Sequence, residues 1–407
     1  MSASAPADRP LRRNREALIL VAVGGFTSTV RWLEMLAIGV FVFDRTGSAF
    51  LVAAMTLLRM LPLALFGAFV GAWAERLRRR PVLLVALALM VLLSLLLAAL
   101  ASGDRIAVWH LGVASFISGV FWSLDFPVRR TLVSDVVTTP RVASAMSLDV
   151  LTNNGSRMLG PLLGGALLQA VGLAGTFVLA AATYALSLAC MLALRHRETP
   201  RGGQGSVLAA LAEGLRYLRG HRALTGILMI TVIFNLFGFP YLSLVPVIGR
   251  EALALSASAI GLMASLEGAG VLVGASALML WARPRHYRRY YVGGLSAFLF
   301  FGMLFAQSPW PVLSAALLLG AGIGGAGFAS MQATLVLLCS EPAARSRMMG
   351  VLLVCIGTAP LGLLHLGWLA DLLGAPAAIS IACIEGLVAI AVVTRVWPEV
   401  LAPQPVD

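Results

Sequence analysis

The sequence consists largely of apolar stretches, each long enough to cross a lipid bilayer as a helix. A spanning helix needs about 20 mostly apolar residues, and lipid offers no hydrogen-bonding partner to an unpaired backbone. Because these runs are longer than the strands of a membrane barrel, they predict an all-α integral membrane protein with twelve transmembrane helices. The expected spans are approximately 17–43, 49–74, 81–101, 106–124, 142–168, 173–194, 223–248, 256–281, 289–306, 311–337, 347–369 and 376–395.

The composition indicates that the bilayer is the solvent for most of the chain. Hydrophobic residues make up 59% of the 407 residues and charged residues 12%, about half the charged share of a soluble protein. This excludes an ordinary soluble enzyme and a disordered chain. The four cysteines lack metal-ligand or redox spacing, and neither a phosphate-binding loop nor a nucleophile–base arrangement stands out. We therefore expect no metal, no cofactor and no enzymatic activity.

The arginines predict the orientation of the spans. The chain contains no Lys, and 24 of its 30 Arg residues fall in termini and connections that share one side of the membrane. Only Arg45, Arg105 and Arg250 fall in connections on the other side. Because cytoplasmic segments carry the excess of basic residues, we expect both termini in the cytoplasm and an even number of spans. The net charge of +12 is thereby explained by the membrane, and no nucleic-acid partner is expected.

The longest connection, residues 195–222, divides the spans into six and six. It begins with the polar, glycine-rich stretch RHRETPRGGQG and continues as SVLAALAEGLRYLRG, in which Leu208, Leu211, Leu215 and Leu218 share one helical face. We expect this second part to form a short amphipathic helix at the cytoplasmic surface. The predicted organisation is a six-helix bundle at 1–194, the linker at 195–222, and a second six-helix bundle at 223–407.

The two halves repeat each other in sequence. A shift of 208 residues matches Ser48 with Ser256, Ala49 with Ala257, Trp73 with Trp281 and Arg80 with Arg288. A shift of 202 residues matches four glycines, Gly155, Gly160, Gly165 and Gly172, with Gly357, Gly362, Gly367 and Gly374. Such a repeat predicts two similar bundles around a pseudo-twofold axis along the membrane normal, the plan of transporters in which one bundle rocks against the other.

Several motifs resemble the major facilitator superfamily. The segment GAWAERLRRRP, Gly71 to Pro81, is similar to the loop signature of that family, with Glu75 where Asp is usual. DFPVRRTLVSDVV, beginning at Asp125, and NLFGFPYLSLVPV in the seventh span are similar to the drug:proton antiporter branch, which includes enterobactin-exporter-like and macrolide-efflux-like proteins. The resemblance covers about residues 15–395. It implies the major facilitator fold and alternating access driven by proton exchange.

Two acids within the spans, Glu34 and Glu267, are candidates for proton coupling. Charged groups are costly inside the bilayer and mark functional sites, and burial favours the protonated form of an acid. At about 1.5 Å per residue, Glu34 and Arg59 lie at the same depth, and Glu267 is the repeat equivalent of Arg59. We expect Arg59 to pair with Glu34, leaving Glu267 free to titrate. Pairing of Arg59 with Glu267 across the cavity, or a permanently ionised structural pair for either acid, is the alternative.

Further polar residues are candidates to line a substrate cavity. Arg31 lies one turn before Glu34, and Arg157 lies near mid-depth, where we expect it to meet an anionic group or the Glu34 cluster. Pro240 is expected to break the seventh span. Packing alone is the alternative for the residues of the fifth and seventh spans. The predicted cavity residues are Arg31, Arg59, Asn154, Arg157, Asn235 and Tyr241.

Acids among the arginines at the cytoplasmic ends of the spans predict a gate. Glu75 is followed by Arg76, and Asp125 lies four residues before Arg129. Anchoring by positive charge explains the arginines but not the acids. We therefore expect interhelical ion pairs that lock one conformation and open when the bundles rock. The predicted gate comprises Gly71, Glu75, Arg76, Arg80, Asp125 and Arg129.

These features predict a secondary transporter that exports small amphipathic molecules, drug-like or siderophore-like, in exchange for protons. A lipid or lysolipid flippase, an uncoupled uptake facilitator and a non-transporting scaffold or sensor are the alternatives. The expected partners are a small-molecule substrate, protons and the lipid bilayer, and the protein is expected to be a monomer. Abundant Ala, Gly and Arg without Lys are typical of a GC-rich bacterial genome, so the predicted location is the bacterial cytoplasmic (inner) membrane.

Overall fold

The computed structural model describes residues 14–76, 79–137, 139–194, 207–342 and 344–403. Helices make up almost all of these ranges, and no strand occurs within them. The principal helices are α1 (Arg15–Thr46), α2 (Ala49–Arg76), α3 (Arg79–Ser102), α4 (Val108–Val136), α5 (Thr139–Leu192), α6 (Val207–Leu218), α7 (Arg222–Ile233), α8 (Val245–Val247), α9 (Ala257–Trp281), α10 (Tyr287–Ala306), α11 (Pro311–Leu338), α12 (Arg345–Ile356), α13 (Ala359–Leu373) and α14 (Ala375–Val396). Shorter turns are η3 (Phe234–Gly238), η4 (Phe239–Leu244), η5 (Ile248–Ala252), η6 (Pro284–His286) and η7 (Pro398–Val400).

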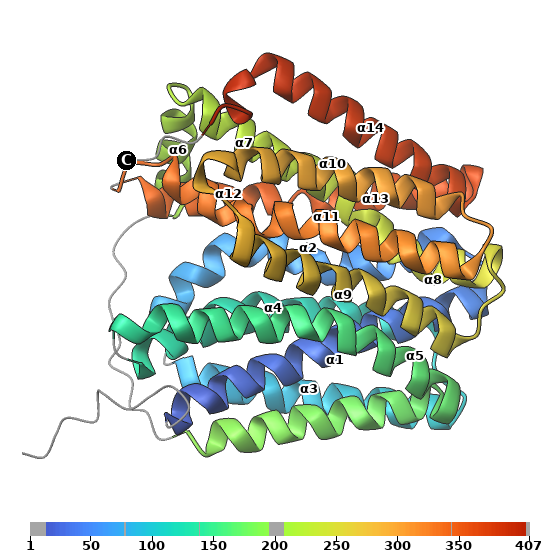
Figure 1. Ribbon diagram of the computed structural model, residues 1–407. Coiled ribbons are helices and arrows are strands. Elements are labelled where there is room, and N and C mark those ends of the chain that lie inside the picture. The colour runs from blue at the N-terminus through green and yellow to red at the C-terminus, as the bar shows by residue number, and fades with distance from the viewer. Residues whose placement is uncertain (1–13, 77–78, 138, 195–206, 343, 404–407) are drawn as a thin grey trace, which may run out of the picture.

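Twelve apolar passes are present, as the sequence predicts. Eleven helical runs in the described ranges are long and apolar enough to cross a membrane. One of them, Ser144–Leu192, has 49 residues, which would extend about 73 Å as one helix, about twice what a bilayer needs. The chain reverses direction at Gly172, where φ is 68°, so this run supplies two antiparallel passes (Figure 1). Gly374, with φ 82°, lies at the equivalent turn before α14.

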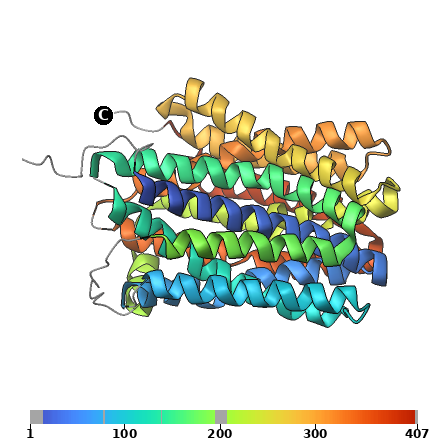
Figure 2. The ribbon, with the colours of Figure 1, turned by 90° about the horizontal axis from the view of Figure 1, so that it is seen from below.

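The two halves of the chain form two bundles that lie side by side (Figures 1 and 2). Helices α1 to α5 make one bundle, blue to green, and α7 to α14 make the other, yellow-green to red. The start of α1 and the end of α14 lie at the same end of the molecule, as an even number of passes requires. Helices α3, α7 and α10 also begin at this end with Arg79, Arg222 and Arg288 close by, and we call it the arginine-rich end.

The internal repeat appears in equivalent polar contacts. Ser48 and Ser256 each cap the following helix, because the hydroxyl oxygen accepts a hydrogen bond from the backbone N–H three residues on. Arg80 donates to the carbonyl groups of the last two residues of α5. Its repeat equivalent, Arg288, donates to the carbonyl of Glu399 just after α14. In each half, the arginine thus joins the third pass to the end of the sixth.

The matched glycines also make equivalent packing contacts. Gly160 lies against the backbone of α1, and Gly362 lies against the backbone of η3 in the seventh pass, which is the repeat equivalent of the first. Gly165 faces α9 of the other half, and Gly367 faces α2 of the other half. The same positions therefore pack each half internally and against its partner, which is the pseudo-symmetry expected from the sequence.

The seventh pass is not a regular helix. α7 continues as the π-helical turn η3, the 3-10 turn η4, the short α8 and the π-helical turn η5. Pro240 and Pro246 lie in this region and cannot donate a backbone hydrogen bond. The expected break at Pro240 takes the form of a change to π and 3-10 turns, and the helical run from Arg222 to Ala252 continues through it. Asn235 lies within η3, and such π turns occur frequently at functional sites.

The amphipathic part of the linker forms α6, at the arginine-rich end. Glu213 of α6 pairs with Arg347 of α12 at 3.1 Å, and Gly214 is buried close to Val351. Leu215 on the same helix is 58% exposed. The helix is therefore packed against the C-terminal half and leaves an apolar side chain uncovered. Its predicted position at the membrane surface stays a prediction, and residues 195–206 lie outside the described ranges.

Candidate functional site

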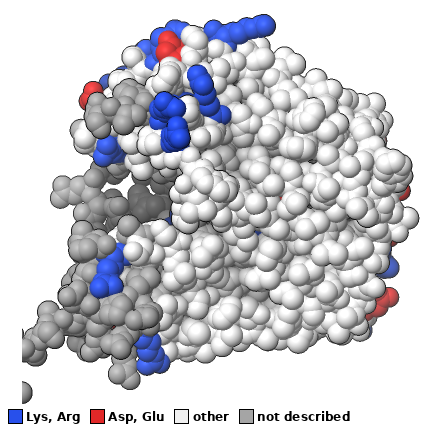
Figure 3. Space-filling model, in the orientation of Figure 1, with Lys and Arg blue, Asp and Glu red and all other residues white. Residues whose placement is uncertain are grey.

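The two halves meet at the end opposite the arginine-rich end, which we call the closed end. Gly165 of α5 packs directly against the backbone of Ala257 and Gly261 of α9, and any larger residue at 165 would overlap that backbone. Asp44 at the end of α1 pairs with Arg250 of η5 at 2.7 Å. Figure 3 shows that charged side chains gather at the two ends of the molecule and that the surface between the ends is almost free of them. The ion pair and the close backbone packing therefore hold the two halves together at the closed end.

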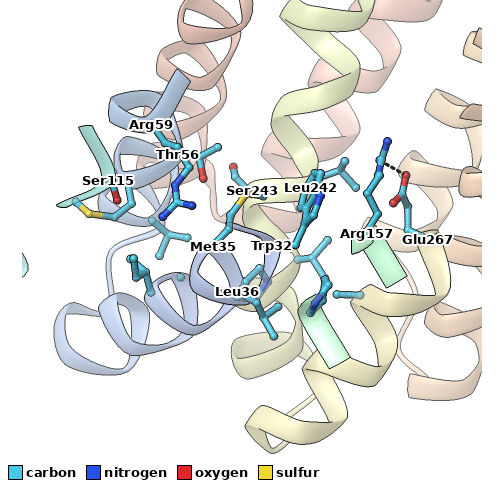
Figure 4. A pocket seen from close by; sticks show the side chains of 18 of the residues that line it. Trp32, Met35, Leu36, Thr56, Arg59, Ser115, Arg157, Leu242, Ser243 and Glu267 are labelled. Atoms are coloured by element: carbon cyan, nitrogen blue, oxygen red, sulfur yellow. Dashed lines mark hydrogen bonds and ion pairs between the residues drawn. The ribbon is translucent and has the colours of Figure 1, made fainter. Parts of the chain in front are cut away.

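Two cavities lie between the halves, along what we call the path. The larger has a volume of ≈ 210 Å³, and we call it the aromatic cavity; its lining includes Trp122, Phe234, Asn235, Phe298, Phe328 and Gln332. The smaller has a volume of ≈ 50 Å³, lies nearer the closed end, and is called the outer cavity; its lining includes Trp32, Met35, Thr56, Arg59, Ser115 and Pro246 (Figure 4). Apolar and aromatic walls with a few polar groups are typical of sites for small organic molecules.

An ion pair between Arg157 of α5 and Glu267 of α9 lies where the two cavities meet (Figure 4). Arg157 Nη2 donates to Glu267 Oε1 at 2.6 Å, and both residues line both cavities. The guanidinium also lies 5.2 Å from the centre of the Trp32 ring. The two side chains are only 19% and 8% exposed, so their charges are weakly screened. Because the partners belong to different halves, the pair joins the halves in the middle of the path.

The expected pairing of Arg59 with Glu34 is present. Arg59 Nη2 donates to Glu34 Oε2 at 3.3 Å, and Nη1 donates to the carbonyl of Arg31 at 3.1 Å. Both side chains are buried between α1 and α2. The linked expectation that Glu267 is left free is wrong, because Arg157 holds it. Arg157 therefore meets Glu267 rather than the Glu34 cluster.

Arg31 lies among polar groups of the N-terminal half. Its guanidinium donates to Asn153 Oδ1 at 3.1 Å and lies 4.6 Å from the centre of the Trp122 ring. Asn154, the residue expected to line the cavity, belongs to the lining of neither the aromatic nor the outer cavity. Successive helical residues point about 100° apart, so the neighbouring Asn153 faces Arg31 instead.

The predicted pair Asp125–Arg129 is present but lies inside one half. Arg129 Nε donates to Asp125 at 3.4 Å on the same helix, and Arg129 Nη1 donates to Asp149 of α5. Arg130 pairs with Asp149 at 2.9 Å, and the Arg129 side chain is only 2% exposed. This network joins α4 to α5. The Asp125–Arg129 pair itself lies within α4, so the expected interhelical contact is made with Asp149 instead, and the role of these residues as a gate stays a prediction.

The other predicted gate residues are Gly71, Glu75, Arg76 and Arg80. The side chains of Gly71, Glu75 and Arg76 lie outside the described part of the chain, so their role stays a prediction. Arg80 donates to the carbonyl groups of Met191 and Leu192, and it thereby holds α3 to the end of α5.

The two candidates from the seventh pass have different surroundings. Asn235 lines the aromatic cavity, and its amide group donates to the carbonyl of Thr231 at 2.8 Å. Tyr241 is fully buried, packs against Phe298 and Gly302 of α10, and lines neither cavity. Tyr241 is therefore part of the core of the C-terminal half, and its expected contact with substrate is not supported by its position.

Three residues of the site were not among the predicted cavity and gate residues. Asp149 and Asn153, on the same helix as Arg157, hold Arg129 and Arg31. Phe328 stacks on Phe234 with ring centroids 4.2 Å apart and forms part of the aromatic wall. Asp149 and Asn153 could have been found from the sequence, because both are polar residues within a span. Phe328 could not, because it follows a glycine-rich apolar stretch without a distinctive pattern.

A repeat of two helical bundles around a central path, with an ion pair joining the bundles at mid-depth, is the plan of transporters of the major facilitator type. A family model described as a transmembrane secretion effector matches residues 5–401. The chain therefore belongs to the transmembrane secretion effector family of the major facilitator superfamily.

Relatives and solved structures agree with this assignment. An uncharacterized MFS-type transporter of Bacillus subtilis (strain 168), YfiS, is 25% identical over 335 residues, covering 79% of this chain and 73% of that protein. The staphyloferrin A transporter of Staphylococcus aureus (strain NCTC 8325 / PS 47) is 20% identical over 243 residues, covering 60% and 61%. The crystal structure of a POT family transporter with 5-aminolevulinic acid has a TM-score of 0.76 at 14% identity, covering 95% and 96%. The crystal structure of a bacterial homolog of the human lysosomal transporter Spinster, inward-facing and unoccupied, has a TM-score of 0.70 at 15% identity. The match covers 96% of this chain and 97% of that chain.

At these identities the structural likeness shows the fold alone. Together with the family, it confirms the coarse prediction of a multi-pass membrane transporter with the major facilitator fold.

Proposed function

We propose that this protein exports small amphipathic molecules, drug-like or siderophore-like, in exchange for protons and by alternating access. The observation that carries the proposal is the Arg157–Glu267 pair, which joins the two halves where the two cavities meet. Protonation of Glu267 removes the charge that holds Arg157. Proton binding and separation of the halves are then linked at a single contact.

The conformation described here corresponds to one stage of such a cycle. Under the positive-inside rule the arginine-rich end faces the cytoplasm, so the closed end faces the opposite side of the membrane. Glu34 and Glu267 each accept a hydrogen bond from an arginine, and in the proposed cycle both acids have released their protons at this stage. A substrate that enters from the cytoplasm meets the aromatic cavity first. Opening the closed end then requires the Asp44–Arg250 contact and the packing of α5 on α9 to separate.

The lining supports an amphipathic substrate. Phe234, Phe298 and Phe328 offer aromatic faces, while Asn235 and Gln332 offer hydrogen-bonding groups. Arg157 at the inner limit of this cavity provides a positive charge that an acidic group of the substrate can contact in competition with Glu267. A siderophore-like molecule combines such features, and one relative is a staphyloferrin A transporter. The family description, a secretion effector, supports export.

The buried Glu34–Arg59 pair provides a second site for a proton. Both partners lie on sequential helices of the N-terminal half, with side chains 4% and 3% exposed. Because Arg59 also lines the outer cavity, a change in the charge of Glu34 alters the polarity of that cavity. We assign Glu34 the role of a second proton acceptor, whose charge affects the outer cavity through Arg59.

The test is transport by the purified protein in proteoliposomes with an imposed pH gradient, using a panel of amphipathic dyes and siderophores. Substrate should move against its own gradient and in the opposite direction to protons, and Glu267→Gln should remove this coupling. Glu213→Gln, which breaks the half-exposed pair with Arg347 on the surface, is the matched control and should transport normally. A transport rate that does not change with the pH gradient would make the protein a facilitator. Movement of fluorescent lysolipid alone would make it a flippase.

A further inference from the structure

A furrow on the C-terminal half lies outside the transport path. Its floor is α11 and its walls are α9 and α10, which both pack along α11 (Figure 1). The furrow has a volume of ≈ 400 Å³, larger than the aromatic cavity, and shares no lining residue with either cavity of the path. A volume of this size on the outside of a bundle can hold part of a ligand that reaches it from the bilayer.

Glycines create this furrow. Gly294 of α10 packs against Gly324 and Gly327 of α11, and Gly274 of α9 packs against Ile323 of α11. These contacts draw the walls onto the floor without filling the space above it. At Gly293 no atom lies within 4 Å of the position that a Cβ would occupy, so the furrow is empty there. The result is a narrow apolar trough along the helices.

The position of the furrow relative to the membrane surface follows from its aromatic residues. Trp281 at the end of α9 is 74% exposed, and Tyr290 at the start of α10 also lines the furrow. Trp and Tyr gather at the boundary between headgroups and acyl chains. Gly274 lies seven residues from Trp281, about 10 Å further along the helix. The furrow therefore opens at headgroup level at the arginine-rich end and continues into the acyl region.

Positive charge surrounds the mouth. Arg289 is exposed and lines the furrow, and Arg283 and Arg285 lie in the adjoining turn. No acid occurs in residues 282–290. The guanidinium group binds phosphate through two parallel hydrogen bonds, and basic pockets between transmembrane helices recognise anionic headgroups. The mouth is thus complementary to a phosphate, and the trough behind it is complementary to an acyl chain.

We propose that the furrow binds an anionic glycerophospholipid from the leaflet at the arginine-rich end. Its phosphate lies on Arg289, and one acyl chain follows the glycines of α10 and α11. The lipid is a resident ligand of the C-terminal half rather than a transported molecule. This site is independent of the proposed transport function, since it shares no residue with the path.

The experiment is lipid binding to the purified protein by native mass spectrometry, with titration of phosphatidylglycerol or phosphatidylcholine of identical chains. Wild type should bind phosphatidylglycerol more tightly, and Arg289→Gln should weaken that binding about 5-fold, toward the level of phosphatidylcholine. Gly293→Leu, whose side chain meets empty space, should fill the trough and reduce the binding of both lipids without unfolding the protein.

Two matched controls separate the site from general effects. Gly155→Leu places a leucine at another helical glycine with open space, and Arg395→Gln removes another exposed arginine from the same end. Both should bind lipid like wild type. Equal binding of the two lipids by wild type, or equal lipid binding by all four variants, would overturn the proposal. Displacement of the lipid by millimolar inorganic phosphate alone would also overturn it and indicate a site for the free anion.

Discussion

Replacing Glu267 with Gln should shift the protein away from the conformation described here. The carboxylate accepts a hydrogen bond from the Arg157 guanidinium at 2.6 Å, across the contact between α5 and α9. A hydrogen bond to a charged group contributes about 1.5–3 kcal/mol. If the pair exists only while the halves are closed at this point, its loss changes the ratio of the two conformations by about 10- to 150-fold. The neutral side chain also mimics a protonated Glu267.

The assay is the distance between two spin labels at the closed end, measured by pulsed electron paramagnetic resonance in nanodiscs. Thr46 and Glu251 are exposed positions next to the Asp44–Arg250 contact, and the labels require prior replacement of the four cysteines. Wild type should give mainly one short distance. Glu267→Gln should give a second, longer distance that becomes the major population.

Asp44→Asn is the control, because it also removes an ion pair between the halves. Asp44 and Arg250 are 44% and 28% exposed, and an exposed pair contributes at most about 1 kcal/mol, or roughly 5-fold. If Glu267→Gln changes the distance distribution no more than Asp44→Asn does, the Arg157–Glu267 pair does not hold the halves together. The proposed link between protonation and movement would then fail.

Three further predictions follow from the same geometry. Glu34→Gln should abolish transport against a gradient while binding of a fluorescent substrate persists; active transport at the wild-type level would exclude Glu34 as proton acceptor. Glu34→Arg combined with Arg59→Glu should give more monodisperse protein in size-exclusion chromatography than either single change, because the two buried charges hold each other; no recovery would show that the pair does not stabilise the fold. Gly165→Leu should slow transport strongly, since overpacking against α9 costs about 1–3 kcal/mol, whereas Gly155→Leu should transport normally; equal rates in the two variants would contradict the close approach at the closed end.

The sequence predicted those features that depend on local pattern. Span length is set by the bilayer, so each apolar run identified a pass without knowledge of its neighbours. The matched glycines were equally informative, because Gly172 and Gly374 both occur at turns with positive φ. Arg59 and Glu34 were placed together by depth alone, since their helices are consecutive in sequence and the connection between them is short.

Contacts between distant helices could not be predicted in the same way. The partner of Glu267 depends on how closely α5 approaches α9, and Gly268 next to Glu267 packs against the backbone of Arg157. The choice between Asn153 and Asn154 depends on the rotation of α5 about its axis. Tyr241 lies beside a cavity-lining stretch but points into α10 because the π turn before it changes the helical register.

The distance between Arg157 and Glu267 along the chain affects how the protein enters the membrane. The two residues are 110 positions apart, which a ribosome needs about 5 to 20 s to translate. During that interval Arg157 lacks the acid that neutralises it. An arginine near the centre of a pass raises the free energy of membrane insertion by about 2.5–3.5 kcal/mol. Trp32 on the already completed first helix is the partner available in the meantime, 5.2 Å from the guanidinium in the finished fold. We therefore expect insertion of the fifth pass to require contact with the first helix before the eighth pass has been synthesised.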